Sequence, residues 1–335
     1  METPKPICMV RDAKEIRPLR SGEQDRVTGF LLCGEGYGDM ICMIPTVEKT
    51  AHQLGRTLNV WTKRPEVFVN IPLLRPRMSD DSELEPHLAG GDLLIVCPVR
   101  FDQSPKWNQT HLAIRPAEGI VQLDDADKEV RLYTTTEDRA TAARLLESLG
   151  TGSKVVIHPN RNRPVRTWPS ERWRQLALGL LGLDVGVVAV GTNVPNLADT
   201  EENIPKGVFE LGIAHDRFLD LTGRTSLHEL CEVIAASDVA VTFDSGVLHV
   251  ANCTETPIVA LFSDNDPNFF TRIRGGKPGV GTVAVHGPCQ TQFCQTWHGA
   301  WSECLQEGDR RMCCLPSVEQ VLEGVMGFLH DKAKP

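Results

Sequence analysis

Short apolar runs alternate with helical segments along this chain, and no other feature limits its fold as strongly. In the first half the apolar runs stand at 28–33, 57–62 and 92–96, and helical patterns stand at 40–54 and 136–149. A strand buried on both faces reads as a continuous apolar run, and parallel strands need a crossover between them that is usually helical. The alternation therefore predicts an α/β fold built from βαβ units.

The same alternation restarts near residue 151. The second half carries apolar runs at 154–158, 185–190, 238–243 and 257–262 and helical patterns at 170–182, 226–237 and 318–331. We predict two Rossmann-like, doubly wound domains facing a central cleft, residues 1–150 and 151–335. Residues 1–27 are expected to form a peripheral extension, and residues 98–135 show no clear period.

Three predicted helices have recognisable starts. Ser226 with Glu229, and Ser317 with Gln320, have the spacing of a capping box, in which the two side chains bond each other's backbone amides. Ser170 is the expected N-cap of the helix that follows it.

Charge and hydropathy exclude several classes of protein. The 35 Lys and Arg residues against 44 Asp and Glu residues give a net charge of −9, so we expect no nucleic-acid partner. No apolar run approaches the roughly 20 residues that span a bilayer, although peripheral membrane contact stays open. The first residues carry charges where a signal peptide needs an apolar stretch, and the 11 cysteines are an odd number. We therefore expect a cytoplasmic protein with reduced thiols.

A glycine-rich loop follows the first apolar run. Gly34, Gly36 and Gly38 lead directly into Asp39, and glycines there allow a ligand to approach the backbone closely. The dinucleotide fingerprint needs a third glycine where Asp39 stands, which counts against a nicotinamide or flavin oxidoreductase. Asp39 is either the N-cap of the helix or a general base at the mouth of the sheet.

A basic loop follows the strand predicted at 154–158. It holds three arginines between Arg161 and Arg166, with Asn162 among them. Guanidinium groups bind phosphate through paired hydrogen bonds, so the loop is a candidate for the phosphates of a nucleotide. The alternative is an ordinary solvated loop. Trp168 and Trp173, just beyond it, are expected to pack against the sheet.

A third polar cluster follows the strand predicted at 238–243. Ser245 and Gly246 open a helix, where backbone amides bind anions, and Asp244 can accept hydrogen bonds from sugar hydroxyls. His249 lies one turn further along. The alternative makes Asp244 the N-cap and His249 a satisfied, half-buried side chain.

Five cysteines crowd the segment 289–314, namely Cys289, Cys294, Cys304, Cys313 and Cys314. Four thiols on loops in a reducing compartment suit a structural zinc or iron ion, and His298 can replace one of them. The spacing lacks the usual pair of cysteines two residues apart, so reduced buried thiols are the alternative.

Several segments resemble glycosyltransferase family 9, the heptosyltransferases. They are GEGYGDMICMIPTVEKTAHQL, then VVIHPN through RTWPSERW, and finally DLTGRTSLHELCEVIAASDVAVTFDSGVLHVANCTETPIVALF. The resemblance implies a GT-B fold and inverting transfer of a heptose or related sugar, usually from ADP-heptose, to a hydroxyl acceptor. The members that modify autotransporters are similar in carrying a four-cysteine metal finger near the C-terminus, with longer spacing.

The resemblance also assigns roles to individual residues. Asp39 matches the catalytic base, and Arg166 stands where the family has a lysine that offsets the charge of the leaving diphosphate. Arg161 and Asn162 replace the family's Thr or Gly at the donor phosphates. The remaining donor-binding matches are Thr225 near the adenine, with Asp244, Ser245, Gly246 and His249 at the sugar and diphosphate.

The expected partner is a nucleotide-sugar donor, and no cofactor or metal is needed for the chemistry because side chains and helix N-termini supply the positive field. The acceptor is open: a glycan, a protein hydroxyl and a small molecule all fit. The alternative function is a non-catalytic nucleotide-sugar-binding or scaffold protein that keeps a structural metal site.

Overall fold

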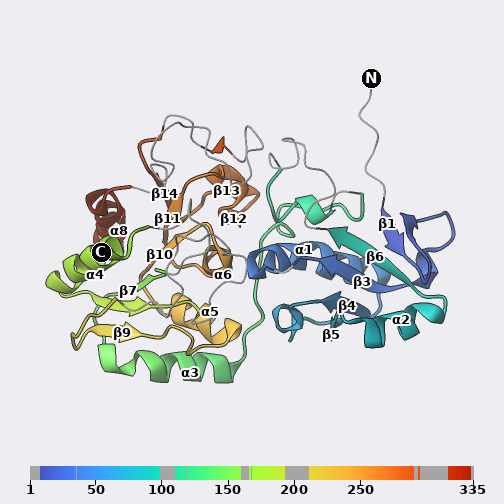
Figure 1. The fold of residues 1–335 in the computed structure, drawn as a ribbon, viewed down its shortest axis with the longest axis horizontal. Helices are drawn as coiled ribbons and strands as arrows, with labels where there is room; N and C mark the ends of the chain where they lie inside the picture. Colours follow the sequence, from blue (N-terminus) through green and yellow to red (C-terminus); the bar gives the residue numbers. More distant parts are fainter. Residues whose placement is uncertain are drawn as a thin grey trace, which may run out of the picture. The chain divides into compact units, whose positions relative to one another are not determined.

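The computed structural model describes residues 8–34, 36–98, 110–117, 119–159, 166, 168–192, 211–289, 293–294 and 316–332. The chain divides into two compact units (Figure 1). The first contains Met1–Tyr133 together with Ile273–Lys277, and the second contains Thr134–Arg272 together with Pro278–Pro335. Each unit is built around one six-stranded sheet, which confirms the predicted α/β class.

The sheet of the first unit has the order β2-β1-β6-β3-β4-β5. Its strands are β1 (Met9–Arg11), β2 (Ile16–Pro18), β3 (Val27–Cys33), β4 (Leu58–Thr62), β5 (Leu74–Met78) and β6 (Leu93–Pro98). The chain runs from β3 outward through β4 to β5 and then returns to β6 on the other side of β3, all in parallel. The sheet therefore reverses its winding direction between β3 and β6, as a doubly wound sheet does.

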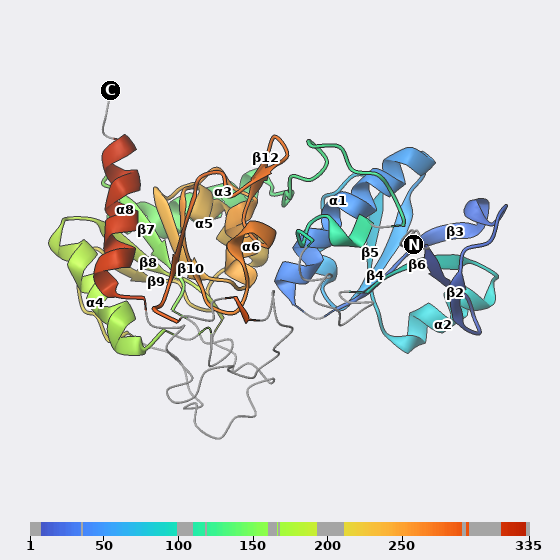
Figure 2. The same ribbon diagram turned by 90° about the horizontal axis from the view of Figure 1, so that it is seen from above.

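Two helices cover this sheet on opposite faces (Figure 2). They are α1 (Tyr37–Leu54), which contains Pro45, and α2 (Asp81–Ala89), whose N-cap Asp80 accepts from the amides of Ser82 and Glu83. Residues 1–27, expected to form a peripheral extension, include β1 and β2, which pair antiparallel and extend the sheet beyond β6. These two strands were not predicted, because three-residue strands at a sheet edge need no apolar pattern.

The sheet of the second unit has the order β14-β11-β10-β7-β8-β9, with every pairing parallel. Its strands are β7 (Lys154–Ile157), β8 (Gly186–Ala189), β9 (Phe218–Asp220), β10 (Val239–Phe243), β11 (Ile258–Phe262) and β14 (Thr282–His286). Counted along the chain, this is the 3-2-1-4-5-6 order of dinucleotide-binding domains. The winding direction reverses between β7 and β10, which are direct neighbours.

The helices of the second unit are α3 (Thr136–Leu146), α4 (Ser170–Gly182), α5 (Leu227–Ala235), α6 (Gly246–Asn252) and α8 (Val318–Lys332). Ser226 and Glu229 form the predicted capping box of α5. Ser317 and Gln320 likewise exchange bonds between side chain and amide. Ser170 is the first helical residue rather than the N-cap, a position that Pro169 occupies without a side-chain bond.

The boundary between the units lies between Tyr133 and Thr134, not after Gly150. Helix α3 packs against α5, and Glu232 on α5 contacts both the start and the body of α3. It accepts from the Thr134 hydroxyl at 2.5 Å and pairs with Arg139 Nε at 3.3 Å. Helix α3 therefore belongs to the second sheet, although it precedes the restart of the strand pattern.

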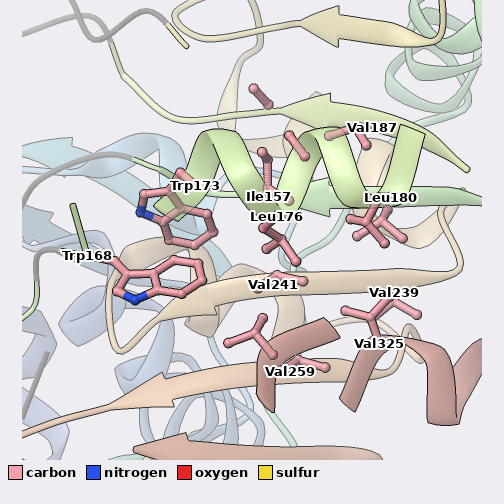
Figure 3. Close-up of a cluster of buried hydrophobic side chains, with 14 of the residues drawn as sticks. Ile157, Trp168, Trp173, Leu176, Leu180, Val187, Val239, Val241, Val259 and Val325 are labelled. Carbon is pink, nitrogen blue, oxygen red and sulfur yellow. The ribbon is translucent and has the colours of Figure 1, made fainter. Parts of the chain in front are cut away.

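Two tryptophans anchor the core beside the basic loop, as predicted. Trp168 and Trp173 are each 1% exposed, and their ring centroids lie 5.0 Å apart at 88°. Figure 3 shows both rings packed between α4 and the strands, with Val241 and Val259 beneath. Trp168 Nε1 also donates to Pro316 O at 3.0 Å. The chain is thus fixed two residues after Arg166.

Within the described residues, no helix combines the length and the apolar character needed to cross a membrane.

Candidate active site

Asp39 lies in the first turn of α1, at the carboxyl end of β3. The N-cap of this helix is Gly36, and Asp39 is its third helical residue, so the alternative that Asp39 is itself the N-cap is wrong. A Cβ built at Gly36 would stand 3.0 Å from Asp39 Oδ2, so the carboxylate folds back over this glycine. A negative charge in the first turn is stabilised by the helix dipole.

The glycines of this loop act through their size rather than through unusual dihedral angles. Gly36 has an extended backbone with φ −79°, which other residues also adopt, but a larger side chain there would crowd Asp39. Gly38 is buried within α1, and Gly34 is half-buried at the end of β3.

Tyr37 holds the first turn of α1 against the loop after β4. Its hydroxyl donates to Glu66 Oε1 at 2.8 Å, and the Arg64 guanidinium lies 4.7 Å from its ring centroid. Burial, and next the bond to Glu66, raise the pKa of Tyr37. The sequence patterns did not predict this contact, because Arg64 and Glu66 belong to no motif and follow the strand predicted at 57–62.

Arg166, between β7 and α4, is held by two carboxylates from two other strand ends. Its Nε and Nη2 donate to the two oxygens of Asp264, at 2.8 and 3.2 Å. Its Nη1 lies 3.2 Å from both the backbone oxygen and Oδ2 of Asp244. The side chain of Arg166 is 12% exposed, and those of Asp244 and Asp264 are 5% and 6% exposed.

Asp244, at the carboxyl end of β10, is the centre of this cluster. Asn265 Nδ2 donates to its Oδ2 at 2.7 Å, and His249 Nε2 lies 3.9 Å from its Oδ1. The N-cap of α6 is Ser245, so the alternative that Asp244 is the N-cap is wrong. Burial lowers the pKa of His249, against the opposing effect of Asp244, so this imidazole is neutral near pH 7.

A second buried group lies at the same end of the sheet. His158 Nδ1 is 3.1 Å from Thr242 Oγ1 and 3.2 Å from Ser245 Oγ. The Thr242 hydroxyl donates to Phe243 O at 3.0 Å. Burial lowers the pKa of His158 to about 4, which keeps the ring neutral. The Ser245 hydroxyl is thus bound to His158 rather than to the amides of α6.

Among the described residues, the charges of the cluster around Asp244 sum to a negative value. Asp244 and Asp264 supply two carboxylates, Arg166 supplies one positive charge, and His249 is neutral. Arg166, expected from the sequence to offset a diphosphate, is already paired in this structure. The arrangement offers many hydrogen-bond acceptors in a buried place, which suits a ligand rich in hydroxyl groups.

The structure brings together Arg166, Asp244, Ser245, Gly246 and His249, as the sequence predicted. They gather where the winding of the second sheet reverses, which is where such sheets bind ligands. Thr225 follows β9 at the same edge of this sheet, with a half-buried side chain. Arg161 and Asn162 lie outside the described residues.

The sequence patterns gave no role to Asp264, Asn265 or His158. Asp264 and Asn265 lie in the loop after β11, and His158 directly follows β7. The usable signal was their position, because each lies within three residues of the end of a buried strand, as Asp244 does.

Two of the five cysteines in the predicted metal segment are described. Cys289 is 8% exposed and Cys294 is half-buried. Cys304, Cys313, Cys314 and His298 lie outside the described residues, and within the described part of the chain no three potential ligands gather. Buried thiols suit a closed structural site, and thiolates are ligands that zinc and iron prefer.

A family model described as glycosyltransferase family 9 (heptosyltransferase) matches residues 106–298, more than half of the chain. The chain belongs to glycosyltransferase family 9. Lipooligosaccharide heptosyltransferase 2 of Haemophilus influenzae is 27% identical to it over 174 residues, 49% of this chain and 49% of that protein. Lipopolysaccharide heptosyltransferase 2 of Salmonella typhimurium is 33% identical over 106 residues, 32% of this chain and 29% of that protein. The family 9 chain thus matches about half or less of the length of these relatives.

Solved structures resemble this family 9 chain over nearly its whole length. A family 9 glycosyltransferase from Veillonella parvula has a TM-score of 0.62 at 16% identity, covering 91% of this chain and 98% of that one. The ADP-heptose lipopolysaccharide heptosyltransferase II of Escherichia coli has a TM-score of 0.57 at 16% identity, covering 92% and 100%. An iron-containing dodecameric glycosyltransferase from enterotoxigenic Escherichia coli has a TM-score of 0.62 at 14% identity, covering 95% and 81%. These likenesses confirm the predicted GT-B fold.

Proposed function

We propose that this chain is an inverting glycosyltransferase that moves a heptose, or a closely related sugar, from ADP-heptose to a hydroxyl acceptor. The observation that carries this proposal is the buried cluster of Arg166, Asp244 and Asp264 at the winding reversal of a Rossmann-ordered sheet. In a member of family 9, this is the position at which a nucleotide-activated donor is expected. The described heptosyltransferase relatives support heptose as the sugar.

The second unit binds the donor in this proposal. Thr225 contacts the nucleoside, and Asp244, Ser245, Gly246 and His249 contact the sugar and diphosphate, with Arg161 and Asn162 assisting at the phosphates. Arg166 offsets the charge of the diphosphate after exchanging part of its pairing with Asp244 for a phosphate oxygen. The two bonds to Asp264 hold the guanidinium in place during that exchange.

Asp39 acts as the general base of the transfer. It takes the proton of the acceptor hydroxyl while that oxygen forms a bond to the anomeric carbon of the heptose. The bond between the anomeric carbon and the phosphate oxygen breaks, and ADP leaves with the electron pair. Attack opposite to the leaving group inverts the configuration. Protein groups rather than a cofactor supply the electrostatic stabilisation, and the cysteine segment 289–314 has a structural role.

The decisive experiment replaces the base and leaves the donor site intact. We expect Asp39→Asn to reduce transfer from ADP-heptose by about 10²- to 10⁴-fold, the usual contribution of general base catalysis. The dissociation constant of ADP-heptose, measured by calorimetry, should change little. Asp25→Asn, an exposed site in the same unit, is the matched control for loss of one negative charge.

Two results would contradict this assignment. Full transfer activity in Asp39→Asn excludes Asp39 as the base. If the unmutated chain binds nucleotide sugars but transfers none of them to any acceptor tested, the chain is instead a non-catalytic nucleotide-sugar-binding protein.

A further inference from the structure

The loop after β11 carries an amide whose orientation is fixed by its neighbour. Asn265 is 3% exposed, and its Nδ2 donates to Asp244 Oδ2 at 2.7 Å. Exchanging the amide oxygen and nitrogen would place two acceptors against each other, so the hydrogen-bond partner settles which atom is which. The amide oxygen therefore points away from Asp244.

That amide oxygen lacks a hydrogen-bond partner. Asn265 Oδ1 is buried, and nothing in the described part of the chain donates to it. A buried acceptor left unpaired lowers stability, and nearly all such groups in proteins are satisfied. Among the buried side-chain atoms of the described residues that lack a partner, Asn265 Oδ1 belongs to a side chain bonded to the charged cluster, where a ligand can satisfy it.

The charges around Asn265 define the chemistry of that ligand. Asp244 and Asp264 outnumber the single positive charge of Arg166, and both carboxylates are nearly buried. Against these acceptors, a hydroxyl group donates a hydrogen bond without bringing a further charge. An asparagine adds one more acceptor without adding a third negative charge.

We propose that Asn265 is a specificity-determining residue for the donor sugar. Its Oδ1 accepts the hydrogen of one sugar hydroxyl, while its Nδ2 holds Asp244, which accepts from another. This inference rests on the proposed function, because it assigns a sugar to the cluster, and it extends that function to a residue to which the resemblance gave no role.

The test separates sugar recognition from nucleotide recognition. The dissociation constants of ADP, ADP-heptose and ADP-heptose analogues that each lack one hydroxyl are measured for the unmutated chain and for Asn265→Ala. We expect the variant to bind ADP within about twofold of the unmutated chain and ADP-heptose about tenfold more weakly, the usual effect of one lost hydrogen bond. One analogue should bind the unmutated chain about tenfold more weakly than ADP-heptose and show no further loss in the variant.

Equal weakening of ADP and ADP-heptose in Asn265→Ala would overturn the inference, because it is the result of a merely structural role. The inference is also overturned if every analogue that lacks one hydroxyl loses as much further affinity in Asn265→Ala as ADP-heptose does. Asn265→Ser, which replaces the amide with a shorter hydroxyl group, replaces the alanine variant if that variant does not fold. Asp264→Asn is the matched control, since it disturbs Arg166 and leaves the Asn265 amide in place.

Failure of the proposed function gives a different pattern. If the unmutated chain binds another nucleotide sugar rather than ADP-heptose, the same comparison is made with that compound and its free nucleotide. If Asn265→Ala then weakens binding of the nucleotide sugar but not of its free nucleotide, the role of Asn265 is supported although the heptose assignment has failed. An unmutated chain that binds no nucleotide sugar overturns both proposals.

Discussion

Arg166 shows why a residue of the same charge is not an equivalent replacement. The resemblance to the family implies a lysine at this position, and a lysine presents one point charge that cannot span both oxygens of a carboxylate. Arg166 does span them, because Nε and Nη2 reach the two oxygens of Asp264. The arginine and Asp264 therefore form one unit, and the positive charge is held at a fixed place rather than on a flexible stem.

His158 makes the stability of the second unit depend on pH. Its pKa is about 4 in the folded chain, against the ordinary value of 6.5, because burial disfavours the charged ring. Below pH 6.5 the unfolded chain takes up a proton that the folded chain does not, so stability falls as the pH drops from 6.5 toward 4. Above pH 6.5 this effect is absent.

We expect His158→Asn to remove this dependence. Between pH 7.5 and pH 5 the histidine contributes a loss of about 2 kcal/mol in the free energy of unfolding, so the variant should lose about that much less than the unmutated chain. Urea denaturation at the two pH values measures the difference. Identical pH profiles for both proteins would show that His158 is not held neutral in the folded state.

At the scale of helices and strands, the sequence predicted elements that are buried on both faces and missed those at the sheet edges. The apolar run 238–243 became β10, and the capping box of Ser226 placed the start of α5 correctly. Strand β5 was missed because it reads LRPRM, with Arg75 and Met78 exposed at the edge of the sheet. An edge strand is covered on fewer sides, so it carries no continuous apolar pattern.

The candidate site was predictable to the extent that its residues share one motif. Asp244 and His249 lie five positions apart, and their proximity follows from a single strand and helix. The contacts of Arg166 with Asp264 join residues 98 positions apart. Those contacts exist because β7, β10 and β11 are consecutive in the sheet, and strand order is not written in any local pattern.

Gly29 illustrates how closely β3 and β4 approach beneath the glycine loop. A Cβ at this position would stand 2.2 Å from the backbone oxygen of Asn59, a distance that no rotamer change relieves. We expect Gly29→Ala to lower the free energy of unfolding by about 3 kcal/mol, at the upper end of the usual effect of overpacking. Chemical denaturation measures this loss.

Gly182→Ala is the matched control for that substitution. Gly182 ends α4 with nothing within 4 Å of a built Cβ, so alanine there should leave stability unchanged or raise it by up to about 1 kcal/mol. If Gly29→Ala and Gly182→Ala change the free energy of unfolding equally, β3 and β4 can move apart without a loss of stability, and the prediction is wrong.

At the scale of the whole chain, the cysteine segment predicts a metal ion that stabilises the fold and takes no part in sugar transfer. We expect the chain, purified under reducing conditions, to contain about one zinc or iron ion, as measured by elemental analysis. A chelator, and likewise Cys289→Ser, should lower the thermal midpoint, while the affinity for ADP-heptose stays within about twofold.

Cys231→Ser is the control, since Cys231 is a buried thiol on α5 outside that segment. It should leave the metal content unchanged. A chain grown with ample zinc and iron that carries neither ion would refute the metal assignment and leave reduced, buried thiols as the description of these cysteines.

The strand order of the second unit links its binding of a donor to its own integrity. Arg166, Asp244 and Asp264 follow three consecutive strands of the sheet. In the proposed function, a donor bound to Arg166 and Asp244 is therefore a non-covalent cross-link over the middle of the unit. When one of these loops moves alone, the donor contacts at the other strand end remain. Because the donor binds only the folded unit, its binding free energy adds to the free energy of unfolding, and tighter binding makes the unit harder to unfold.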